Sequence, residues 1–376
     1  MTDVKRDAAL ATAAGLLGTG LSDPVDLGGS SRSAVMRARR ADGGTVVVRA
    51  HDLDQPEALR RFAAEAAGLA FSPRGPRLLA ADRGSAVTVM SDLGSWPNLA
   101  DVLLGDDPAA ATTALLAWAR AYGGIARESL ERGAELDALL DRYGGGDPSW
   151  NDSPWIAERL PGFAVELAAL GIPVPPGLHD DLAAIGALTR VGPRVFSPGD
   201  ICPDNNLLTD AGLRVVDFEG AGYHSAYLDS AYVTMPFATC WCAFGMPGEV
   251  AAEVESAYWT ELTGAGPTEA DRAGIRLAVA AWTLDLTRFL LPKAAAADGP
   301  MHPARRPIGT KRQVLRHRWR LAGELLSAAG ELPAVAEACG ALLRFSEGWG
   351  TSELGVYPAF AGGPFSTRPA TPACVA

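Results

Sequence analysis

Three polar residues of this sequence, Asp200, Asn205 and Asp217, have side chains and a spacing that suit proton transfer and cation binding. Four residues separate Asp200 from Asn205 in the segment SPGDICPDN (197–205), and a turn and a β-branched run then lead to Asp217. One carboxylate can accept a proton from a hydroxyl, while an amide and a second carboxylate can hold Mg²⁺. Phosphoryl transfer requires such a base and such a cation. Alone, the Asp200–Asn205 pair could also form a simple turn closed by Asx hydrogen bonds.

The bulk composition indicates an ordinary globular protein with two separate cores. The chain has 376 residues, 48% hydrophobic and 20% charged, which is more than one compact domain usually holds. Its net charge of −11 argues against a nucleic-acid backbone as a partner, because phosphates repel an acidic surface. The same charge suits a small cationic ligand, although acidity for solubility is the simpler explanation.

The sequence predicts neither a membrane span nor an exported protein. It contains no long uncharged apolar stretch, and its acidic N-terminus lacks the pattern of an export signal. An odd number of cysteines favours free thiols and a cytoplasmic location. Cys240-x-Cys242 is too tight for a zinc knuckle and has no partner pair at suitable spacing, so no cysteine metal site is predicted.

The first 92 residues are expected to form a small β-rich lobe with a leading helix. Alternating side chains around a glycine-containing turn predict strands, and an amphipathic stretch from Glu57 to Ala70 predicts a helix. The expected further elements are a helix over Asp7–Leu17 and strands over Thr45–Ala50 and Ser85–Met90.

Residues 93–350 are expected to form a larger, mostly helical lobe. Helical periodicity recurs on both sides of the polar segment 197–219, and the residues from about Gly350 are rich in Gly, Pro, Ser and Thr. Residues 351–376 are therefore predicted to be a flexible tail. The expected later helices cover Tyr227–Phe244, Pro247–Thr263, Glu269–Leu291, Gln313–Ala328 and Leu332–Leu343.

With these elements in order, the chain resembles the aminoglycoside phosphotransferase family, which has a protein-kinase-like fold. The resemblance covers roughly Leu27 to Arg288 and is sharpest in PGDICPDN (198–205) and DFE (217–219). It implies an α+β, bilobal fold with a small β-rich N-lobe. It also implies that Asp200 is the catalytic base and that Asn205 and Asp217 hold Mg²⁺.

In the small lobe the resemblance implies a binding site for ATP or GTP. Arg49 would contact the α- and β-phosphates and pair with Glu65 on the next helix. The backbone of Gly28, Gly29 and Ser30 would lie over the phosphates. Ser91 and Leu93 would belong to the hinge whose backbone groups recognise the base.

Two positions depart from the family pattern. Pro198 replaces the histidine that usually precedes Gly-Asp, and Arg49 replaces a lysine. A guanidinium is flatter and bulkier than an ammonium group, so the second exchange is not conservative. No lysine lies between Lys5 and Lys293 that could take the place of Arg49.

The resemblance implies transfer of the γ-phosphoryl group of a nucleotide to a hydroxyl of a small molecule, an aminoglycoside-like antibiotic among the candidates. Two alternatives stay open: a metabolic kinase for a choline-, sugar- or homoserine-like acceptor, and a regulatory pseudokinase. Four acidic side chains could face a cationic acceptor: Glu219, Glu249, Glu253 and Asp285. Three tryptophans could wall its pocket: Trp241, Trp259 and Trp282.

Overall fold

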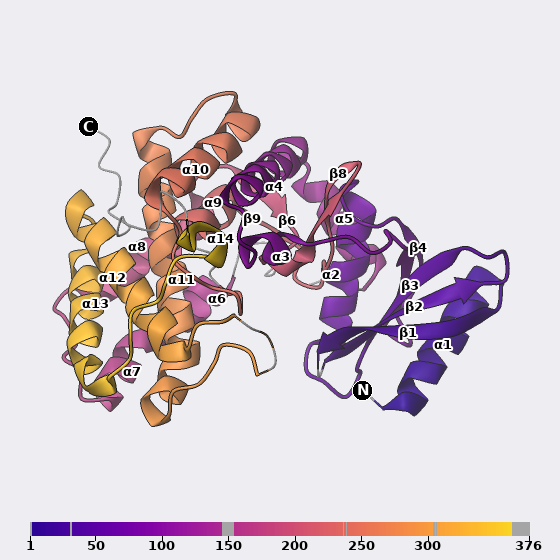
Figure 1. The fold of residues 1–376 in the computed structure, drawn as a ribbon, viewed down its shortest axis with the longest axis horizontal. Helices are drawn as coiled ribbons and strands as arrows, with labels where there is room; N and C mark the ends of the chain where they lie inside the picture. Colours follow the sequence, from indigo (N-terminus) through magenta and orange to yellow (C-terminus); the bar gives the residue numbers. More distant parts are fainter. Residues whose placement is uncertain are drawn as a thin grey trace.

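The chain folds into two lobes of different composition. The computed structural model describes residues 2–30, 32–144, 154–235, 237, 239–303, 305 and 307–362. A strand-rich lobe that carries α1 lies at one end of the molecule, and a larger helical lobe lies at the other (Figure 1). The predicted bilobal α+β fold is confirmed.

The small lobe is built on a five-stranded antiparallel sheet with the order β1-β2-β3-β5-β4. On β3, Val46, Val48 and Ala50 pack with Ala9 and Ala13 of the first helix. Because side chains alternate along a strand, the residues between them point to the opposite face of the sheet. The elements of this lobe are α1 (Asp3–Leu17), β1 (Leu21–Ser30), β2 (Ser33–Arg40), β3 (Thr45–His51), α2 (Ala58–Phe71), β4 (Leu78–Asp82) and β5 (Val87–Ser91).

Helix α2 connects the two lobes of the molecule. Phe62 is fully buried and Glu65 is 1% exposed, so the carboxylate of this helix must find its partners inside the protein. At the end of α2, Phe71 packs against Phe196 of the large lobe, with ring centroids 4.8 Å apart. The helix therefore positions Glu65 at the junction of the lobes.

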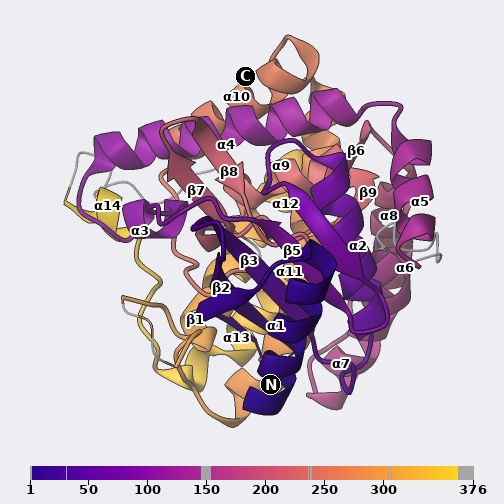
Figure 2. The ribbon, with the colours of Figure 1, turned by 90° about the vertical axis from the view of Figure 1, so that its right-hand side faces the viewer.

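The large lobe consists of helices around two short β-hairpin-like pairs. Helix α4 runs along the top of the molecule beside α10 (Figure 2). The elements before the second strand pair are α3 (Leu99–Leu103), α4 (Pro108–Ser129), α5 (Gly133–Arg142), α6 (Pro154–Arg159), α7 (Phe163–Ala169), α8 (Leu178–Gly186) and β6 (Arg194–Ser197). The remaining elements are β7 (Asn206–Thr209), β8 (Gly212–Val215), β9 (Gly222–Ser225), α9 (Ala226–Thr234), α10 (Gly248–Thr263), α11 (Glu269–Ala296), α12 (Lys311–Ala329), α13 (Pro333–Phe345) and α14 (Pro358–Ala361).

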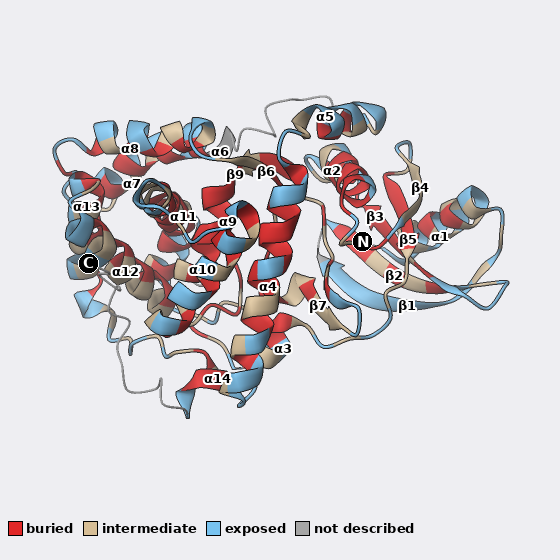
Figure 3. Cartoon of the chain, turned by 90° about the horizontal axis from the view of Figure 1, so that it is seen from above, coloured by how far each residue is buried: buried red, intermediate tan, exposed pale blue. Residues whose placement is uncertain are grey.

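The core of this lobe is rich in aromatic side chains. Figure 3 shows the inward faces of α4, α9 and α11 as buried. Trp259 is fully buried, and its indole N–H donates to the Ser230 hydroxyl at 2.9 Å. Trp282 donates in the same way to the Leu228 carbonyl at 3.0 Å. Both tryptophans therefore belong to the core, where their rings are buried and their N–H groups have hydrogen-bond partners. This differs from the expectation that they could wall an acceptor pocket.

Two helix ends differ from those predicted. Helix α9 ends at Thr234, not at Phe244, because Pro236 follows and the residues before a proline are disfavoured in helices. Helix α11 instead continues through Pro292 to Ala296. None of the helices in the described ranges combines the length and the apolar composition that crossing a bilayer requires.

The C-terminal segment packs more tightly than predicted. Tyr357 and Phe360 are fully buried, and Gly245 exchanges backbone hydrogen bonds with Gly355 and Tyr357. The prediction of a loose tail from residue 351 is therefore wrong for residues up to Phe360, because two aromatic side chains fix this segment against the large lobe. Residues 363–376 lie outside the described part of the chain.

Candidate active site

The segment that carries Asp200 is placed by the pairing of β6 with β9. Ser197 is opposite Gly222 in this pair, so the residues that follow β6 lie beside those that precede β9. Gly199 has a φ of +87°, and a Cβ atom there would lie 2.1 Å from the Gly220 carbonyl oxygen. Only glycine fits this close approach. The Asp200 segment thus abuts the segment that begins with Asp217.

Hydrogen bonds then bring Asn205 to the same place. The Asn205 side-chain amide donates to the Asp200 main-chain carbonyl at 3.0 Å. The oxygen of that side chain is therefore the atom that can bind a cation. The Val216 N–H donates to the Asn205 carbonyl at 2.9 Å, which places Asn205 beside the residue that follows Val216. Asp200, Asn205 and Asp217 are thus brought together, although they are spread over the sequence.

The residue at the strand end, Asp217, has an unusual backbone conformation. Its φ is +69°, a left-handed conformation that costs a non-glycine residue about 1–2 kcal/mol. The next residue, Phe218, is fully buried, and it lies so close to Gly68 and Gly75 that a Cβ atom at either glycine would come within 3 Å of its ring. Burial of this ring holds Asp217 in its strained geometry.

Arg49 lies at the centre of an ion-pair cage that joins the two lobes. The guanidinium makes two hydrogen bonds to Asp217, at 2.7 and 3.2 Å. It also contacts Glu65 at 3.2 Å and Glu219 at 3.0 Å. The Phe218 N–H donates to Glu65 at 2.8 Å. Three carboxylates thus share the guanidinium of Arg49, and burial raises the pKa of one of them, Glu65, to about 7.

The surroundings change the proton affinities of these groups in opposite directions. Burial raises the pKa of Asp200, and the charges of Asp217 and Asp204 raise it further against the hydrogen bond from Cys202. Burial also opposes the charged form of Asp217, but Arg49 outweighs it and lowers the pKa of that carboxyl. For Glu65, burial raises the pKa, and the charge of Arg49 limits the rise.

A buried aspartate from α9 steadies the loop at the position where Pro198 lacks a side-chain donor. The Ser197 hydroxyl donates to Asp229 at 3.0 Å and accepts the Gly199 N–H at 3.1 Å. His224 Nε2 bonds the same Asp229 oxygen at 2.9 Å. Asp229 lies in the first turn of α9, which begins at Ala226, and its carboxylate holds the loop.

The glycine-rich hairpin lies over the same region. Gly28 and Gly29 have φ values of +103° and +131°, and a Cβ atom at Gly29 would lie 2.5 Å from a backbone oxygen of β2. Just beyond this strand, Arg32 reaches the large lobe and pairs with Glu219 at 3.1 Å. Ser30 ends β1, and its side chain is outside the described part of the chain. The hairpin is therefore tied to the Arg49 cage.

The sheet register supplies an apolar surface beside Arg49. Val35 is paired with Arg49 across β2 and β3, and Val47, two residues before Arg49, points to the same face. At the hinge, the Ser91 N–H donates to the Arg77 carbonyl at 2.9 Å. The Leu93 carbonyl accepts the Trp96 indole N–H at 2.7 Å. These two bonds fix the backbone between Ser91 and Leu93.

The acidic candidates for the acceptor side have different surroundings. Glu219 pairs with Arg49 and Arg32 of the small lobe, which contradicts its expected place against an acceptor. Asp285 pairs with Arg159 at 3.7 Å, and Glu253 is exposed on α10. Glu249, at the start of α10, is also exposed. Trp241 lies by the catalytic loop, where its indole N–H donates to Asp204 at 2.7 Å.

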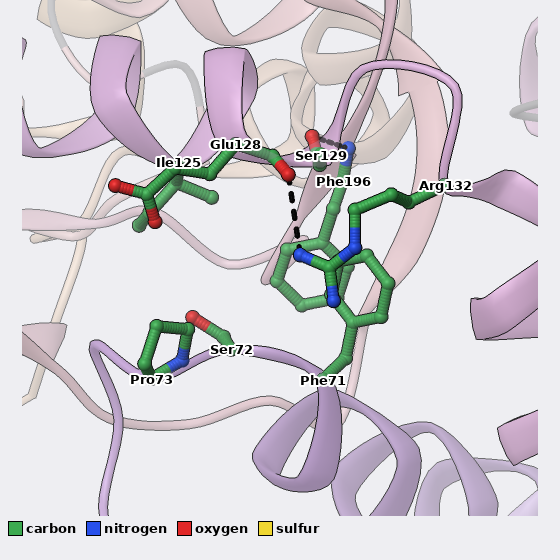
Figure 4. A pocket seen from close by; sticks show the side chains of 8 residues that line it. All are labelled: Phe71, Ser72, Pro73, Ile125, Glu128, Ser129, Arg132 and Phe196. Carbon is green, nitrogen blue, oxygen red and sulfur yellow. Dashed lines mark hydrogen bonds between the residues drawn. The ribbon is translucent and has the colours of Figure 1, made fainter.

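A small pocket behind the catalytic loop shows how α4 anchors β6 (Figure 4). The Phe196 N–H donates to the Ser129 hydroxyl at 2.9 Å, and Arg132 stacks over Phe71 with its guanidinium carbon 4.4 Å from the ring centroid. This pocket contains none of the residues predicted to do chemistry. Its role is structural, since it fixes the strand that leads to Asp200.

Sequence reasoning missed several residues that complete the site. Ser197, Arg32 and Asp204 hold the loop, the hairpin and Trp241, respectively. Each acts through a partner far away in the chain, so no local pattern marks it. The serine immediately before Pro198-Gly199-Asp200 was the one available signal, because a hydroxyl there can replace the missing histidine donor.

Comparison with solved structures supports the fold. No protein-family model matches the sequence, and no curated protein does either. A choline/ethanolamine kinase family protein from Mesorhizobium loti is 18% identical with a TM-score of 0.52, covering 90% of this chain and 99% of that one. A putative fructosamine-3-kinase from Thermobifida fusca is 22% identical with a TM-score of 0.51 and coverages of 84% and 98%. A choline kinase from Cryptosporidium parvum is 10% identical with a TM-score of 0.51 and coverages of 85% and 93%. At these identities the likeness establishes a shared fold, the protein-kinase-like one that the sequence resemblance implied.

Proposed function

We propose that this chain is a small-molecule kinase that transfers the γ-phosphoryl group of ATP or GTP to a hydroxyl. The convergence of Asp200, Asn205 and Asp217 beside the Arg49–Glu65 pair carries this proposal. The fold shared with choline kinase and fructosamine kinase structures supports the same chemistry at the junction of the lobes. The cytoplasmic location predicted from the cysteines stays a prediction.

In the proposed mechanism, Asp200 accepts the proton of the acceptor hydroxyl. Its raised pKa makes it a stronger base than an ordinary carboxylate. Arg49 would hold the α- and β-phosphates by exchanging its bond to Glu219 for phosphate oxygens, while Glu65 keeps its guanidinium in place. The Gly28–Gly29 backbone covers the phosphates, and the Ser91 and Leu93 backbone contacts the base.

The oxygen donors of Asn205 and Asp217 suit Mg²⁺, which prefers hard oxygen ligands. Both Asp217 oxygens accept from Arg49, but a carboxylate oxygen has a second lone pair with which to bind a metal. When bound, Mg²⁺ would neutralise charge between the β- and γ-phosphates.

We propose that the acceptor is a hydroxylated small molecule, and a cationic one fits best. Trp241 lies near Asp200 through its bond to Asp204, and the Arg305 guanidinium carbon lies 4.5 Å from the Trp241 ring centroid. An aromatic face that accommodates a guanidinium can also accommodate an ammonium group. Aminoglycoside-like, choline-like and amino-sugar acceptors all satisfy this description.

The test is a reaction of the purified full chain with Mg²⁺, ATP or GTP, and a panel of hydroxylated acceptors. Mass spectrometry should detect a phosphorylated acceptor with the wild-type chain and none with Asp200→Asn. Neutral sugars and cationic amino alcohols in the same panel compare the acceptor classes. Nucleotide binding without any phosphorylated product would favour the pseudokinase alternative, and absence of nucleotide binding would refute both.

A further inference from the structure

Two buried thiols and a carboxylate meet next to the catalytic loop. Cys202, Asp204 and Cys240 each offer one donor atom, and these atoms all lie within 4.8 Å of one another. Cys202 and Asp204 follow Asp200 along the catalytic loop, whereas Cys240 comes from the loop that follows α9. The cluster thus joins two segments that are far apart in the sequence.

A third thiol lies beside this group. The Cys242 sulfur is 3.0 Å from the Cys240 sulfur, and both residues are at most 1% exposed. The sequence analysis predicted no cysteine metal site, because Cys240-x-Cys242 has no partner pair nearby in the chain. Folding supplies the missing partners from the catalytic loop. Cys202, Asp204 and Cys240 supply three donors within reach of one another, and Cys242, which contacts only Cys240 of these three, would have to turn toward the ion to supply the fourth donor of a tetrahedral site.

The carboxylate of the cluster is already oriented. The Trp241 indole N–H donates to Asp204 Oδ2 at 2.7 Å, as outer groups commonly do for carboxylates that bind metals. Asp204 is half-buried, and it offers an ion a route from solvent to thiols that are themselves enclosed.

A buried cation compensates for the negative charge that ion binding would create. Arg318 of α12 is 2% exposed and donates to the Phe237 carbonyl at 3.2 Å. Burial lowers the pKa of this guanidinium, while the nearby tyrosines and the Cys240 and Cys202 thiols oppose that effect. Its charge would stabilise thiolates bound to an ion, because electrostatic interactions are strong where water is excluded.

We propose that Cys202, Cys240, Cys242 and Asp204 form a binding site for a thiophilic divalent cation of the Zn²⁺ type. The thiol protons leave to solvent as the thiolates bind the ion. With zinc–sulfur bonds of about 2.3 Å, tetrahedral ligands lie about 3.8 Å apart. The donor atoms of Cys202, Asp204 and Cys240 are at most 4.8 Å apart. Binding an ion would therefore require them to move closer by at most about 1 Å.

This site is distinct from the proposed magnesium site. Asn205 and Asp217 offer only oxygen atoms, which suit Mg²⁺, whereas thiolates select zinc-like ions. An ion at the thiol site would connect the catalytic loop to the loop after α9. It would thereby restrict the backbone from Cys202 to Asp204, which begins two residues after the proposed base.

The experiment titrates Co²⁺ into the reduced, metal-free full chain and follows absorption. Tetrahedral thiolate binding gives a sulfur-to-cobalt charge-transfer band, which a single equivalent should saturate and which Zn²⁺ should remove. Cys240→Ser should abolish the band, and Asp204→Asn should weaken binding while retaining it. Cys339→Ser is the matched control, because this thiol is also fully buried but lies on α13, and it should leave the band unchanged.

Circular dichroism melting shows whether each variant is folded. Asp204→Asn is the variant expected to disturb folding least, because Asp204 is only half-buried. The absence of a charge-transfer band from the reduced wild-type chain would overturn the proposal. A band that survives Cys240→Ser would do the same. The rival outcome is a disulfide within the cluster, which a count of free thiols before reduction would detect. If the protein binds no ion after such a disulfide is reduced, the proposed site is also contradicted.

Discussion

Two aspartates of the same site, Asp200 and Asp217, have opposite environments. Asp217 is held by two hydrogen bonds from Arg49, which lower its pKa despite burial. Among the described residues no basic side chain forms an ion pair with Asp200, and burial with two neighbouring carboxylates raises its pKa. Groups whose pKa values are pushed apart in this way are suited to different tasks.

The comparison shows how one residue type can serve as both a cation ligand and a base. A lowered pKa keeps Asp217 ionised and able to bind a metal, whereas a raised pKa gives Asp200 a greater affinity for a proton. The difference arises from Arg49, which the small lobe supplies to Asp217 and not to Asp200. The site therefore depends on contact between the lobes.

The largest effect is expected from Asp200→Asn, which removes the proposed base. Turnover should fall by about 10²–10⁴-fold, the usual contribution of general-base catalysis. Steady-state phosphorylation of an acceptor identified by mass spectrometry measures the loss. Near-normal turnover by the folded variant would show that Asp200 is not the base.

Arg49→Met tests the other side of the comparison. Removing the guanidinium leaves Glu65 buried without its partner, which should lower the free energy of unfolding by about 3–5 kcal/mol. Urea denaturation measures the change. The deficit should shrink as the pH falls, because burial raises the pKa of Glu65 and its protonation removes the unpaired charge.

Arg32→Met is the matched control for that variant. Its side chain is 46% exposed and pairs with Glu219, so its loss should change stability by at most about 1 kcal/mol. Equal effects of the two substitutions would contradict the central role of Arg49.

A smaller effect is expected from Ser197→Ala in the loop that carries Asp200. The change removes hydrogen bonds to Asp229 and from Gly199, which should cost about 1 kcal/mol of unfolding free energy. It should also lower kcat more than it raises KM, because Asp200 becomes less well positioned. Ser33→Ala is the control, since the buried Ser33 hydroxyl has no partner among the described residues, and both quantities should stay unchanged.

The smallest effect is a shift in pH dependence caused by Asp204→Asn, measured on chains kept free of zinc-type ions. The base must be deprotonated, so activity should be present above the pKa of Asp200 and lost as the pH falls through it. The Asp204 charge raises that pKa, and its removal should move the acid limb of kcat/KM to lower pH. Asp210→Asn, at an exposed turn, should leave the limb in place; a shift to higher pH with Asp204→Asn would contradict the assignment.

The sequence predicted the parts of the site that lie close together in the chain. Asp200 and Asn205 share one short segment, and the hairpin of β7 and β8 brings Asp217 back to it, so local patterns were sufficient. Alternation in β3 likewise predicted a strand that carries Arg49. The Ser197–Asp229 and Arg32–Glu219 contacts join residues that are distant in sequence, and their formation depends on the packing of whole elements.

The same limit explains the error at the C-terminus and the cysteine contacts that the sequence did not indicate. The composition after Gly350 resembles a loop, but Tyr357 and Phe360 find apolar partners that only the folded lobe provides. Cys240 meets Cys202 for the same reason. Composition describes what a segment prefers when alone, whereas these contacts depend on tertiary structure.

The most direct test of the two-aspartate account is calorimetric binding of Mg²⁺ and a non-hydrolysable ATP analogue to Asp217→Asn and Asp200→Asn. The account predicts that Asp217→Asn loses the Mg²⁺-dependent part of nucleotide binding, whereas Asp200→Asn binds as the wild type does. Equal loss in both variants, or no loss in either, would contradict the division of roles between these carboxylates.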